Sequence, residues 1–288
     1  MPRVSALIPV CNGEKYIAEA IDSMLGQSFK DIEVIVIDDG STDGTPAVLD
    51  GYGDAIRRVA HPVCRGQAAA LNTGRTLVTG EYVALLDADD VSMPERVATQ
   101  VEYLARSPDV ALVYSDRMII DSEGASVELA RATAPDLFRL LQRNYVPRSS
   151  VLARTSCLNE TGPFDEVNTG NDDWDMWVRV SERHTLGYIP SPLIKYRLHE
   201  SNISLIRRRR QNYYRLTRLR MLKGAYRRRG RPWWLGLMVL RARLEWLAGR
   251  PALYGERFPR VWSGAAKMAE SFERAFLRRA ARPKGTAT

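Results

Sequence analysis

Several acidic side chains of this 288-residue chain follow directly after short apolar runs. The stretch "ALLDADDVSMP" ends an apolar run in three carboxylates within four positions, Asp87, Asp89 and Asp90, and "EVIVIDD" ends in Asp38 and Asp39. Like charges at such close spacing repel one another. A hard divalent cation prefers oxygen ligands and would offset that repulsion. The first cluster therefore predicts a site for Mg²⁺ or Mn²⁺.

The same acidic residues also have a purely structural interpretation. Asp is a favoured N-cap residue, so Asp89 or Asp90 could cap a helix that begins near Pro94. In "IDDGSTDGT", Asp43 stands where a helix could start, and capping is the favoured interpretation there. The spacing of the first cluster does not by itself decide between a cation site and a solvated turn.

The segments between these acidic positions alternate between strand-like and helix-like patterns. Short runs rich in β-branched residues predict buried strands at 4–10, 33–39, 82–87 and 110–116. Apolar residues at helical spacing predict helices at 14–27, 66–78 and 93–107. This alternation favours an α/β fold with a mostly parallel central sheet flanked by helices. In such a fold, ligands bind beyond the carboxyl ends of the strands.

The pattern beyond residue 120 is less regular. It predicts a short helix at 135–142, a strand leading into a helix at 149–155 and a helix at 171–183. Two phosphate-binding signatures are missing from the sequence: no GxGxxG follows the first strand, and no GxxxxGK[ST] occurs. Their absence argues against a dehydrogenase and against a P-loop enzyme.

Charge divides the chain near residue 204. Residues 205–288 contain 23 Lys and Arg against 4 Asp and Glu, whereas residues 1–204 contain 19 against 30. This asymmetry predicts an acidic domain at 1–204 and a basic helical C-terminal extension at 205–288. The Trp-containing stretch from Trp233 to Leu240, flanked by arginines, suits a helix at an anionic membrane surface. Packing on the acidic domain or in a homo-oligomer explains it equally well, and nucleic-acid binding is the least favoured partner.

The location of the protein is predicted from what the sequence lacks. The three cysteines are widely spaced and form no metal-binding or disulfide pattern. The N-terminal apolar run is too short for a signal peptide, and no run reaches the roughly 18–20 apolar residues of a membrane span. We therefore expect a cytoplasmic protein, held at the inner face of the membrane if the basic extension binds lipid.

Seven motifs together resemble the family 2 glycosyltransferases in order and spacing. They are "SALIPVCNGEKYIAEAIDSMLGQSF", "EVIVIDDGSTDGT", "RGQAAALNTG", "GEYVALLDADD", "GPFDE", "NDDWDMWVRV" and "YRLHESNIS". The resemblance covers about two thirds of the chain, from Val4 to Ser204. It implies a GT-A fold, a nucleotide-sugar donor, most often a UDP-sugar, and transfer with inversion to an acceptor hydroxyl. A glycan or lipid-linked acceptor in polysaccharide or other cell-surface glycan synthesis is the expected setting.

The resemblance also implies roles for individual residues. Asp39 would contact the nucleotide base, and Asp87 would face the ribose or the donor sugar. Asp89 would be the first metal ligand, with Asp90 beside it. The full implied donor set is Pro9, Val10, Asp39, Arg65, Asp87 and Asp90, and the implied metal set is Asp89, Asp90 and His199.

The general base implied by the resemblance is Asp173. A direct displacement requires the acceptor hydroxyl to lose its proton as it attacks, which a carboxylate near the reactive carbon achieves. The chain reads Asp172-Asp173 where the family more often has Glu-Asp. It also has Cys11 where the family often has a Tyr that stacks on the base. The second departure leaves open an alternative, a nucleotide-sugar-binding or scaffolding protein without catalysis.

Overall fold

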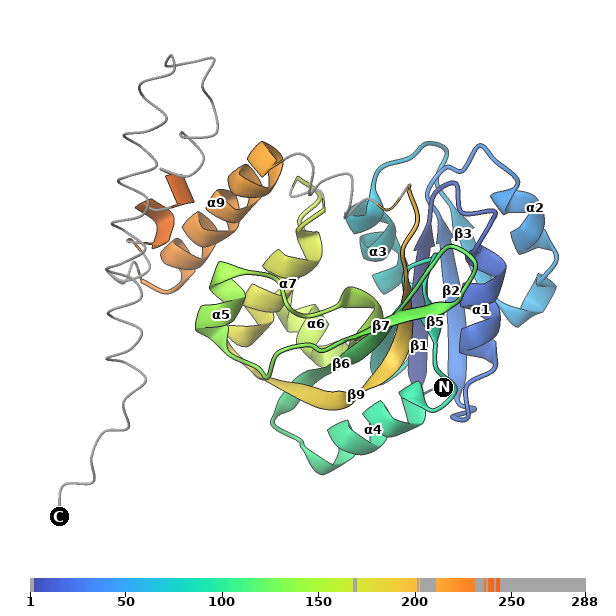
Figure 1. Ribbon diagram of the computed structural model, residues 1–288, viewed down its shortest axis with the longest axis horizontal. Coiled ribbons are helices and arrows are strands. Elements are labelled where there is room, and N and C mark those ends of the chain that lie inside the picture. Colours follow the sequence, from blue (N-terminus) through green and yellow to red (C-terminus); the bar gives the residue numbers. More distant parts are fainter. Residues whose placement is uncertain are drawn as a thin grey trace. The chain divides into compact units, whose positions relative to one another are not determined.

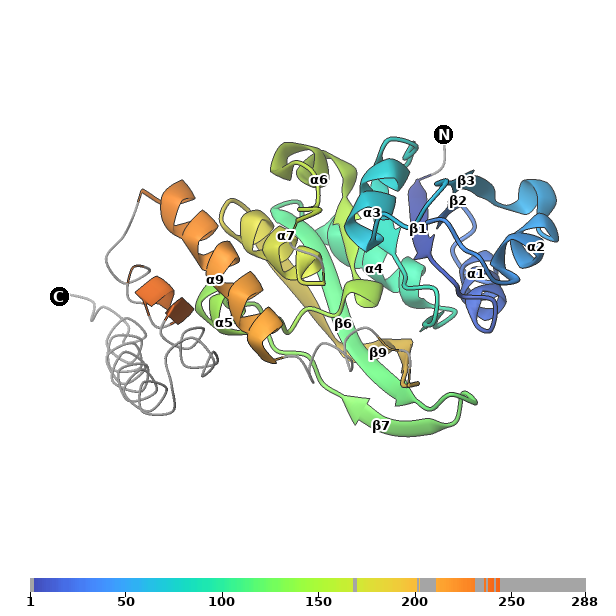
Figure 2. The ribbon, with the colours of Figure 1, turned by 90° about the horizontal axis from the view of Figure 1, so that it is seen from above.

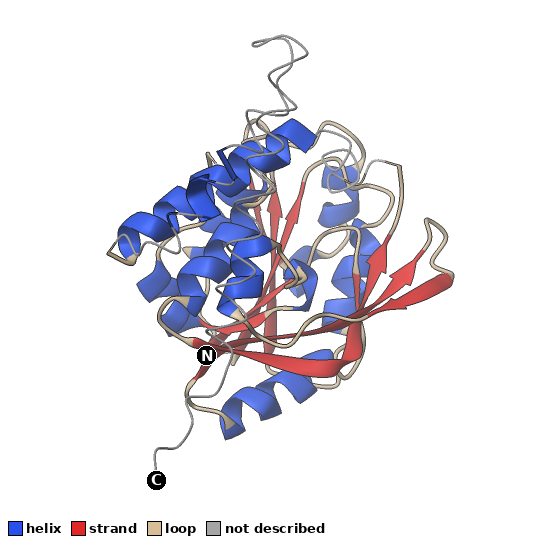
Figure 3. Ribbon diagram, turned by 60° about the vertical axis from the view of Figure 1, so that its left-hand side comes forward, coloured by secondary structure: helices blue, strands red, loops and turns tan. Residues whose placement is uncertain are grey.

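The computed structural model describes residues 3–167, 170–200, 202, 211–230, 236, 238–240, 242 and 243. The chain divides into two compact units, Met1–Asn202 and Ile203–Thr288. Within the first unit, nine strands form one sheet, with helices on both of its faces (Figures 1 and 3). The expectation of an α/β fold is therefore confirmed.

The first half of the sheet is parallel. It contains β1 (Val4–Val10), β2 (Ile32–Asp38), β3 (Arg57–Ala60) and β4 (Tyr82–Leu85), in the order β3-β2-β1-β4. The register pairs Val10 with Asp38 in β2 and Leu7 with Leu85 in β4. The carboxyl ends of these strands therefore meet at one edge of the sheet, and the residues that follow them are brought close together.

The second half of the sheet is mixed. It contains β8 (Leu152–Arg154), β6 (Val110–Ile120), β9 (Thr185–Arg197), β5 (Val91–Ser92) and β7 (Ser126–Ala130). β8 runs antiparallel to both β4 and β6, whereas β6 and β9 run parallel to each other. β5 and β7 join as antiparallel partners of β9 and β6. Parallel pairing is thus largely confined to the first half of the sheet and to β6 with β9.

Two helices cover opposite faces of the parallel strands because successive strand residues point to opposite sides. α1 (Ile17–Leu25) buries Ile17, Ile21 and Met24 in the cluster that holds the even-numbered residues of β1. α3 (Gln67–Arg75) packs on the other face, where a Cβ at Gly74 would lie 2.7 Å from Ile37 Cδ1 and 3.2 Å from Leu7 Cδ2. Figure 2 shows these layers from above.

The remaining helices are divided between the two halves of the sheet, with the helix at 45–50 packed against α1 beside the parallel strands (Figure 1). They are α2 (Thr45–Asp50), α4 (Arg96–Arg106), α5 (Leu137–Gln142), α6 (Thr155–Thr161) and α7 (Asp172–Ser181), with the 3₁₀ segments η1 (Gly53–Ala55) and η2 (Arg148–Ser150). α7 begins directly at the acidic motif, and its residues Trp174 and Trp177 are fully buried. Each helix predicted from the sequence in this unit is present.

The second unit contains α9 (Gln211–Arg228), in which Leu222 and Ala225 are buried and Arg227 and Arg228 are exposed. Most of the basic extension, including the arginine run at 207–210 and both tryptophans of the Trp-containing stretch, lies outside the described residues. No helix in the described part of the chain is long and apolar enough to span a membrane. The proposed roles of the extension stay predictions.

Candidate functional site

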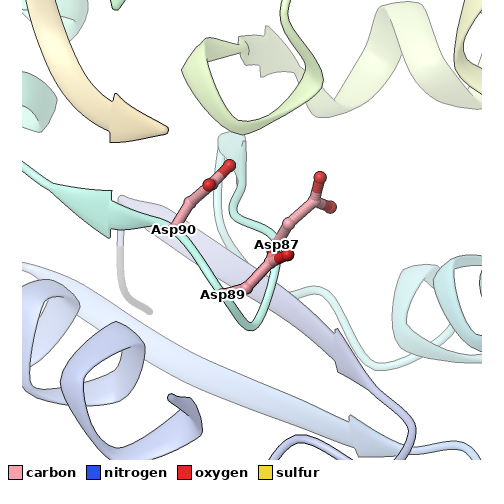
Figure 4. A group of neighbouring side chains, drawn as sticks. All are labelled: Asp87, Asp89 and Asp90. Atoms are coloured by element: carbon pink, nitrogen blue, oxygen red, sulfur yellow. The ribbon is translucent and has the colours of Figure 1, made fainter. Parts of the chain in front are cut away.

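The acidic cluster occupies a tight turn at the carboxyl end of β4. The Asp90 amide donates to the Asp87 carbonyl over 3.1 Å, and β5 begins at the next residue. Figure 4 shows the three carboxylates projecting from this one loop, and their ligand atoms lie within 4.8 Å of one another. The capping alternative is wrong, since α4 begins only at Arg96 and its N-cap Glu95 makes no side-chain cap hydrogen bond.

Asp90 anchors this turn from beneath. Its side chain is 1% exposed, Oδ1 accepts from the Arg197 amide at the end of β9, and Oδ2 accepts from the Ser149 hydroxyl in η2. Burial raises the pKa of Asp90 well above its usual range, and the charges of Asp89 and Asp87 raise it further. Both oxygens of Asp90 are therefore engaged in holding three elements together.

Asp89 is more accessible and meets the motif that follows β9. Its Oδ2 lies 2.9 Å from His199 Nε2 and 3.0 Å from Asn202 Nδ2. Burial and the charge of Asp87 raise the pKa of Asp89 and outweigh the lowering effect of His199. The fold thus brings His199 to the carboxylate with which the sequence associated it, from 110 residues away in the chain.

Asp87 is paired with an arginine that the sequence did not single out. Arg148 of η2 donates from Nε to Asp87 Oδ1 over 2.9 Å and from NH2 to Oδ2 over 3.0 Å. Gln67 Nε2, at the start of α3, also donates to Oδ1 over 2.8 Å. The third nitrogen of the guanidinium, NH1, lies 3.4 Å from Asp172 Oδ2. Arg148 therefore joins the acidic turn to the start of α7.

Asp173 lies in the first turn of α7, as its dual interpretation as helix start and candidate base required. Its Oδ1 accepts from the Trp174 amide and its Oδ2 accepts from Asn144 Nδ2 over 2.9 Å. Burial raises the pKa of Asp173 to about 6; the charge of Arg148 works against this rise and that of Asp172 adds to it. A carboxyl group with this pKa is ionised at neutral pH and is still basic enough to accept a proton.

Asp39 is held in a pocket of hydrogen-bond donors formed by the loop after β3. The carboxylate accepts from His61 Nδ1 at 2.6 Å, from the Gly66 amide at 2.7 Å, from the Arg65 amide and from the Cys64 thiol. Burial alone would raise the pKa of Asp39, but these hydrogen bonds outweigh it and lower the pKa. The side chain is 3% exposed, so a nucleotide base would have to displace one of these donors to bind it.

The other residues implied for the donor lie around Asp39. The Val10 carbonyl accepts from the Asp39 amide over 2.7 Å, and Pro9 precedes it in β1. The Arg65 guanidinium is half exposed and lies 3.6 Å from Glu166. The Cys11 thiol is exposed, and burial together with a hydrogen bond to Cys64 raises its pKa to about 12. Their roles toward a donor stay predictions.

Two other motif residues, Asp43 and Arg197, have structural roles. Asp43 precedes Gly44, the N-cap of α2, so it is not the capping residue itself; its carboxylate accepts from the Thr45 and Glu14 amides and stabilises the turn before the helix. Arg197, in the motif "YRLHESNIS", has a side chain that is 2% exposed, pairs with Glu19 and donates to the carbonyls of Asp89, Asp121 and Ser122. The geometry therefore assigns Arg197 to the support of the acidic turn.

Sequence reasoning missed Arg148, Asn144 and Gln67, which contact the predicted site residues directly. Arg148 follows a proline in an irregular segment, and no spacing rule associates it with Asp87, 61 residues earlier. Asn144 precedes the same segment and meets Asp173 because α5, which ends just before it, packs against α7.

The acidic turn fits a divalent cation by its donor set. Three carboxylates offer oxygen ligands within one small volume, and burial together with the charges of the neighbouring carboxylates raises the pKa values of Asp89 and Asp90. His199 lies beside Asp89 and could add a nitrogen ligand. Hard cations such as Mg²⁺ and Mn²⁺ prefer such oxygen-rich sites.

A parallel half-sheet, an acidic turn after its fourth strand and a mixed second half together form the GT-A glycosyltransferase fold. The model of the family described as "Glycosyl transferase family 2" matches residues 5–166, which is more than half of the chain. The chain therefore belongs to glycosyl transferase family 2. This finding confirms the resemblance on which the residue roles were based.

Known relatives and structures agree with this assignment. An uncharacterized glycosyltransferase of Rickettsia felis is 34% identical over 212 residues, which are 69% of this chain and 34% of the relative. A putative glycosyltransferase of Bacillus subtilis, EpsE, is 29% identical over 65% of this chain and 69% of its own length. The chain thus spans only about a third of the Rickettsia felis relative.

Two solved structures share the fold. One is TarS 1-349 of S. aureus in complex with UDP-GlcNAc, with a TM-score of 0.64, 17% identity, and coverage of 87% of this chain and 73% of TarS. The other is the mannosyltransferase PcManGT of Pyrobaculum calidifontis in complex with GDP-Man and Mn²⁺. It has a TM-score of 0.59 and 21% identity, and the match covers 96% of this chain and 83% of PcManGT.

Proposed function

We propose that the protein transfers a sugar from a nucleotide-sugar donor to an acceptor hydroxyl with inversion of the anomeric centre. The observation that carries this proposal is the arrangement of two acidic groups around Arg148. The turn with Asp87, Asp89 and Asp90 lies on one side, and Asp172 with Asp173 lies on the other. An inverting transferase needs two separate acidic groups of this kind, because the leaving diphosphate and the attacking hydroxyl lie on opposite sides of the reacting carbon.

The residues divide the work as follows. Asp89, with Asp90 and His199, would hold Mg²⁺ or Mn²⁺, which when bound offsets the charge that develops on the leaving diphosphate. Asp173 takes the proton from the acceptor hydroxyl as its oxygen forms a bond to the anomeric carbon. The bond from that carbon to the diphosphate breaks with its electron pair on the leaving oxygen. The proton then passes from Asp173 to water.

The identity of the donor is proposed from the neighbours. The complexes of TarS with UDP-GlcNAc and of PcManGT with GDP-Man support a sugar nucleotide in general. We favour a UDP-sugar, with Asp39 as the base contact and Pro9, Val10 and Arg65 around it. A glycan or lipid-linked acceptor, a membrane surface at the basic extension and a homo-oligomer remain proposals.

The test is a panel of UDP- and GDP-sugars, assayed for transfer or donor hydrolysis with Mg²⁺, with Mn²⁺ and with EDTA. We expect Asp173→Asn to bind the donor normally and to slow transfer about 10² to 10⁴-fold, the usual contribution of a general base. Asp89→Ala should lose metal-dependent donor binding. Asp109→Asn is the control, because Asp109 is exposed in the turn between α4 and β6.

Two results would contradict the proposal. Normal transfer by Asp173→Asn would remove this residue as the base. A wild-type protein that binds a nucleotide sugar but never turns it over, with any donor and either metal, would favour the alternative of a non-catalytic binding protein.

A further inference from the structure

Arg148 is the one cation in the described part of the chain that contacts both acidic groups of the site. Its side chain is 14% exposed, and the partner carboxylates of Asp87 and Asp172 are 19% and 1% exposed. A forked contact from Nε and NH2 to both oxygens of Asp87 fixes that carboxylate in orientation as well as in position. NH1 remains directed to Asp172.

We propose that Arg148 is a positioning residue of the transfer reaction, which orients Asp87 on the donor side and holds a positive charge beside Asp172 and Asp173 on the acceptor side. This inference rests on the proposed function and assigns a role to a residue outside the motifs of the sequence. Arg148 would not touch the reacting atoms. It would act through the carboxylates on either side.

The donor half of the argument is geometric. Asp87 follows β4 without the backbone support that Asp90 receives from β9, and its side-chain partners are Arg148 and Gln67. Loss of the guanidinium would leave one amide contact to hold a carboxylate that is expected to face the ribose or sugar. Lysine could keep the charge but not the forked contact.

The acceptor half of the argument is electrostatic. The positive charge of Arg148 opposes the effect of burial on the pKa of Asp173, whereas the negative charge of Asp172 adds to it. Apart from Lys195 and the buried Cys157 of α6, the charged and titratable groups of the elements that pack on α7 are paired with other groups. These pairs are Arg139 with Asp136, Glu160 with His184, Arg179 with Asp175, Tyr188 with Asp116, Arg197 with Glu19, and the Tyr196 ring with Arg117; Lys195 lies opposite Val91 in the sheet.

The experiment compares three variants of the full chain, each assayed with the donor and metal that the wild type uses best. Arg148→Met removes both the positive charge and the two parallel hydrogen bonds to Asp87, whereas Arg148→Lys keeps the charge and removes only the paired hydrogen bonds. Arg179→Met is the matched control, since Arg179 is also 14% exposed and pairs with Asp175 in the same helix α7. Rates at saturating donor are measured from pH 5 to 9, together with the KM for the donor and the melting temperature.

We expect Arg148→Met to move the acidic limb of the rate profile upward by about 1 to 3 pH units, because an opposite charge at close range has been removed. Its rate at pH 7 would fall and recover at pH 9. Arg148→Lys should keep the wild-type limb but raise the KM for the donor about tenfold. Arg179→Met should lower the melting temperature and change neither the limb nor the KM.

If Arg148→Met folds and the acidic limb of its pH–rate profile stays at the wild-type position, the electrostatic role of Arg148 on the acceptor side is overturned. A normal KM in Arg148→Lys would overturn the donor half. If Arg148→Met does not fold, Arg148→Gln removes the charge with a polar side chain and tests the pH profile in its place. Failure of the proposed function is distinguishable from either result, because then the wild type itself would show no transfer and no profile to compare.

Discussion

The pKa of Asp173 gives the sharpest prediction for the reaction. A general base must be ionised to accept a proton, and an Asp with a pKa of about 6 is ionised to about 9% at pH 5 and about 91% at pH 7. The rate at saturating donor should therefore rise about tenfold between these two pH values. An Asp with an ordinary pKa near 3.9 would already be about 90% ionised at pH 5, so the rate would hardly change.

The assay is initial-rate release of the nucleoside diphosphate at saturating donor and metal, in overlapping buffers of constant ionic strength. Asp173→Glu keeps a carboxylate and should retain an acidic limb at a different position. Asp173→Asn should give a flat residual rate over the same range. A wild-type limb below pH 4.5 would refute the reasoning, because it would mean that the essential base is not the buried carboxyl at the start of α7.

The ionisation of Asp173 should also be visible in the stability of the protein: it raises the rate of transfer but lowers the free energy of unfolding. The folded-state pKa of Asp173 is raised, so folding favours the protonated form, and ionisation costs the folded state up to about 3 kcal/mol as pH rises from 4 to 7. Asp173→Asn cannot ionise. Its melting temperature should therefore exceed that of the wild type at pH 7.5 by more than it does at pH 4.5, as measured by calorimetry.

Two further predictions concern the support of the donor side. Asp39→Asn should destabilise the protein by about 1 to 3 kcal/mol in urea unfolding at pH 7. The side-chain NH2 group of asparagine is a donor, and it would face the backbone amides and the thiol that donate to the carboxylate in the wild type. The pKa of Asp39 is lowered, so the difference should shrink as pH falls through 4, and a constant difference would contradict this account. Gly40→Ala should cost more than Gly53→Ala: both have positive φ, but only at Gly40 would the Cβ meet backbone, 2.4 Å from the Val63 carbonyl carbon. Equal urea midpoints for the two alanine variants would contradict the close approach.

The elements that the sequence predicted well are those whose signal is local. β1 and α1 were recognisable from unbroken apolar runs and helical spacing. β9 was not predicted, because Gly187, Pro190 and Pro192 interrupt it and proline is unfavourable in a strand interior. It is stabilised by its long pairing with β6, which shifts register around these residues. Such pairing depends on partners far away in the chain and leaves no local pattern.

The site residues also divide into those that could be predicted from a local pattern and those that could not. Asp87, Asp89 and Asp39 could be singled out because a charge at the end of an apolar run is unusual, and parallel register brings strand ends together. Arg148 and Asn144 could not, because a single arginine or asparagine in an irregular segment has many possible partners. Their roles follow from where η2 packs between β4 and β9.

The placement of Arg148 explains how five carboxylates can share one site. Asp90 is buried, and both of its oxygens accept hydrogen bonds, from the Ser149 hydroxyl and from the Arg197 amide. Asp87 and Asp172 are each paired with the same guanidinium. Asp89 contacts His199 and Asn202, and Asp173 accepts hydrogen bonds from an asparagine and a backbone amide. Among the described residues, Asp89, Asp90 and Asp173 form no ion pair with an arginine, and they are the carboxylates proposed to meet the cation and the acceptor proton, which is where uncompensated charge is useful.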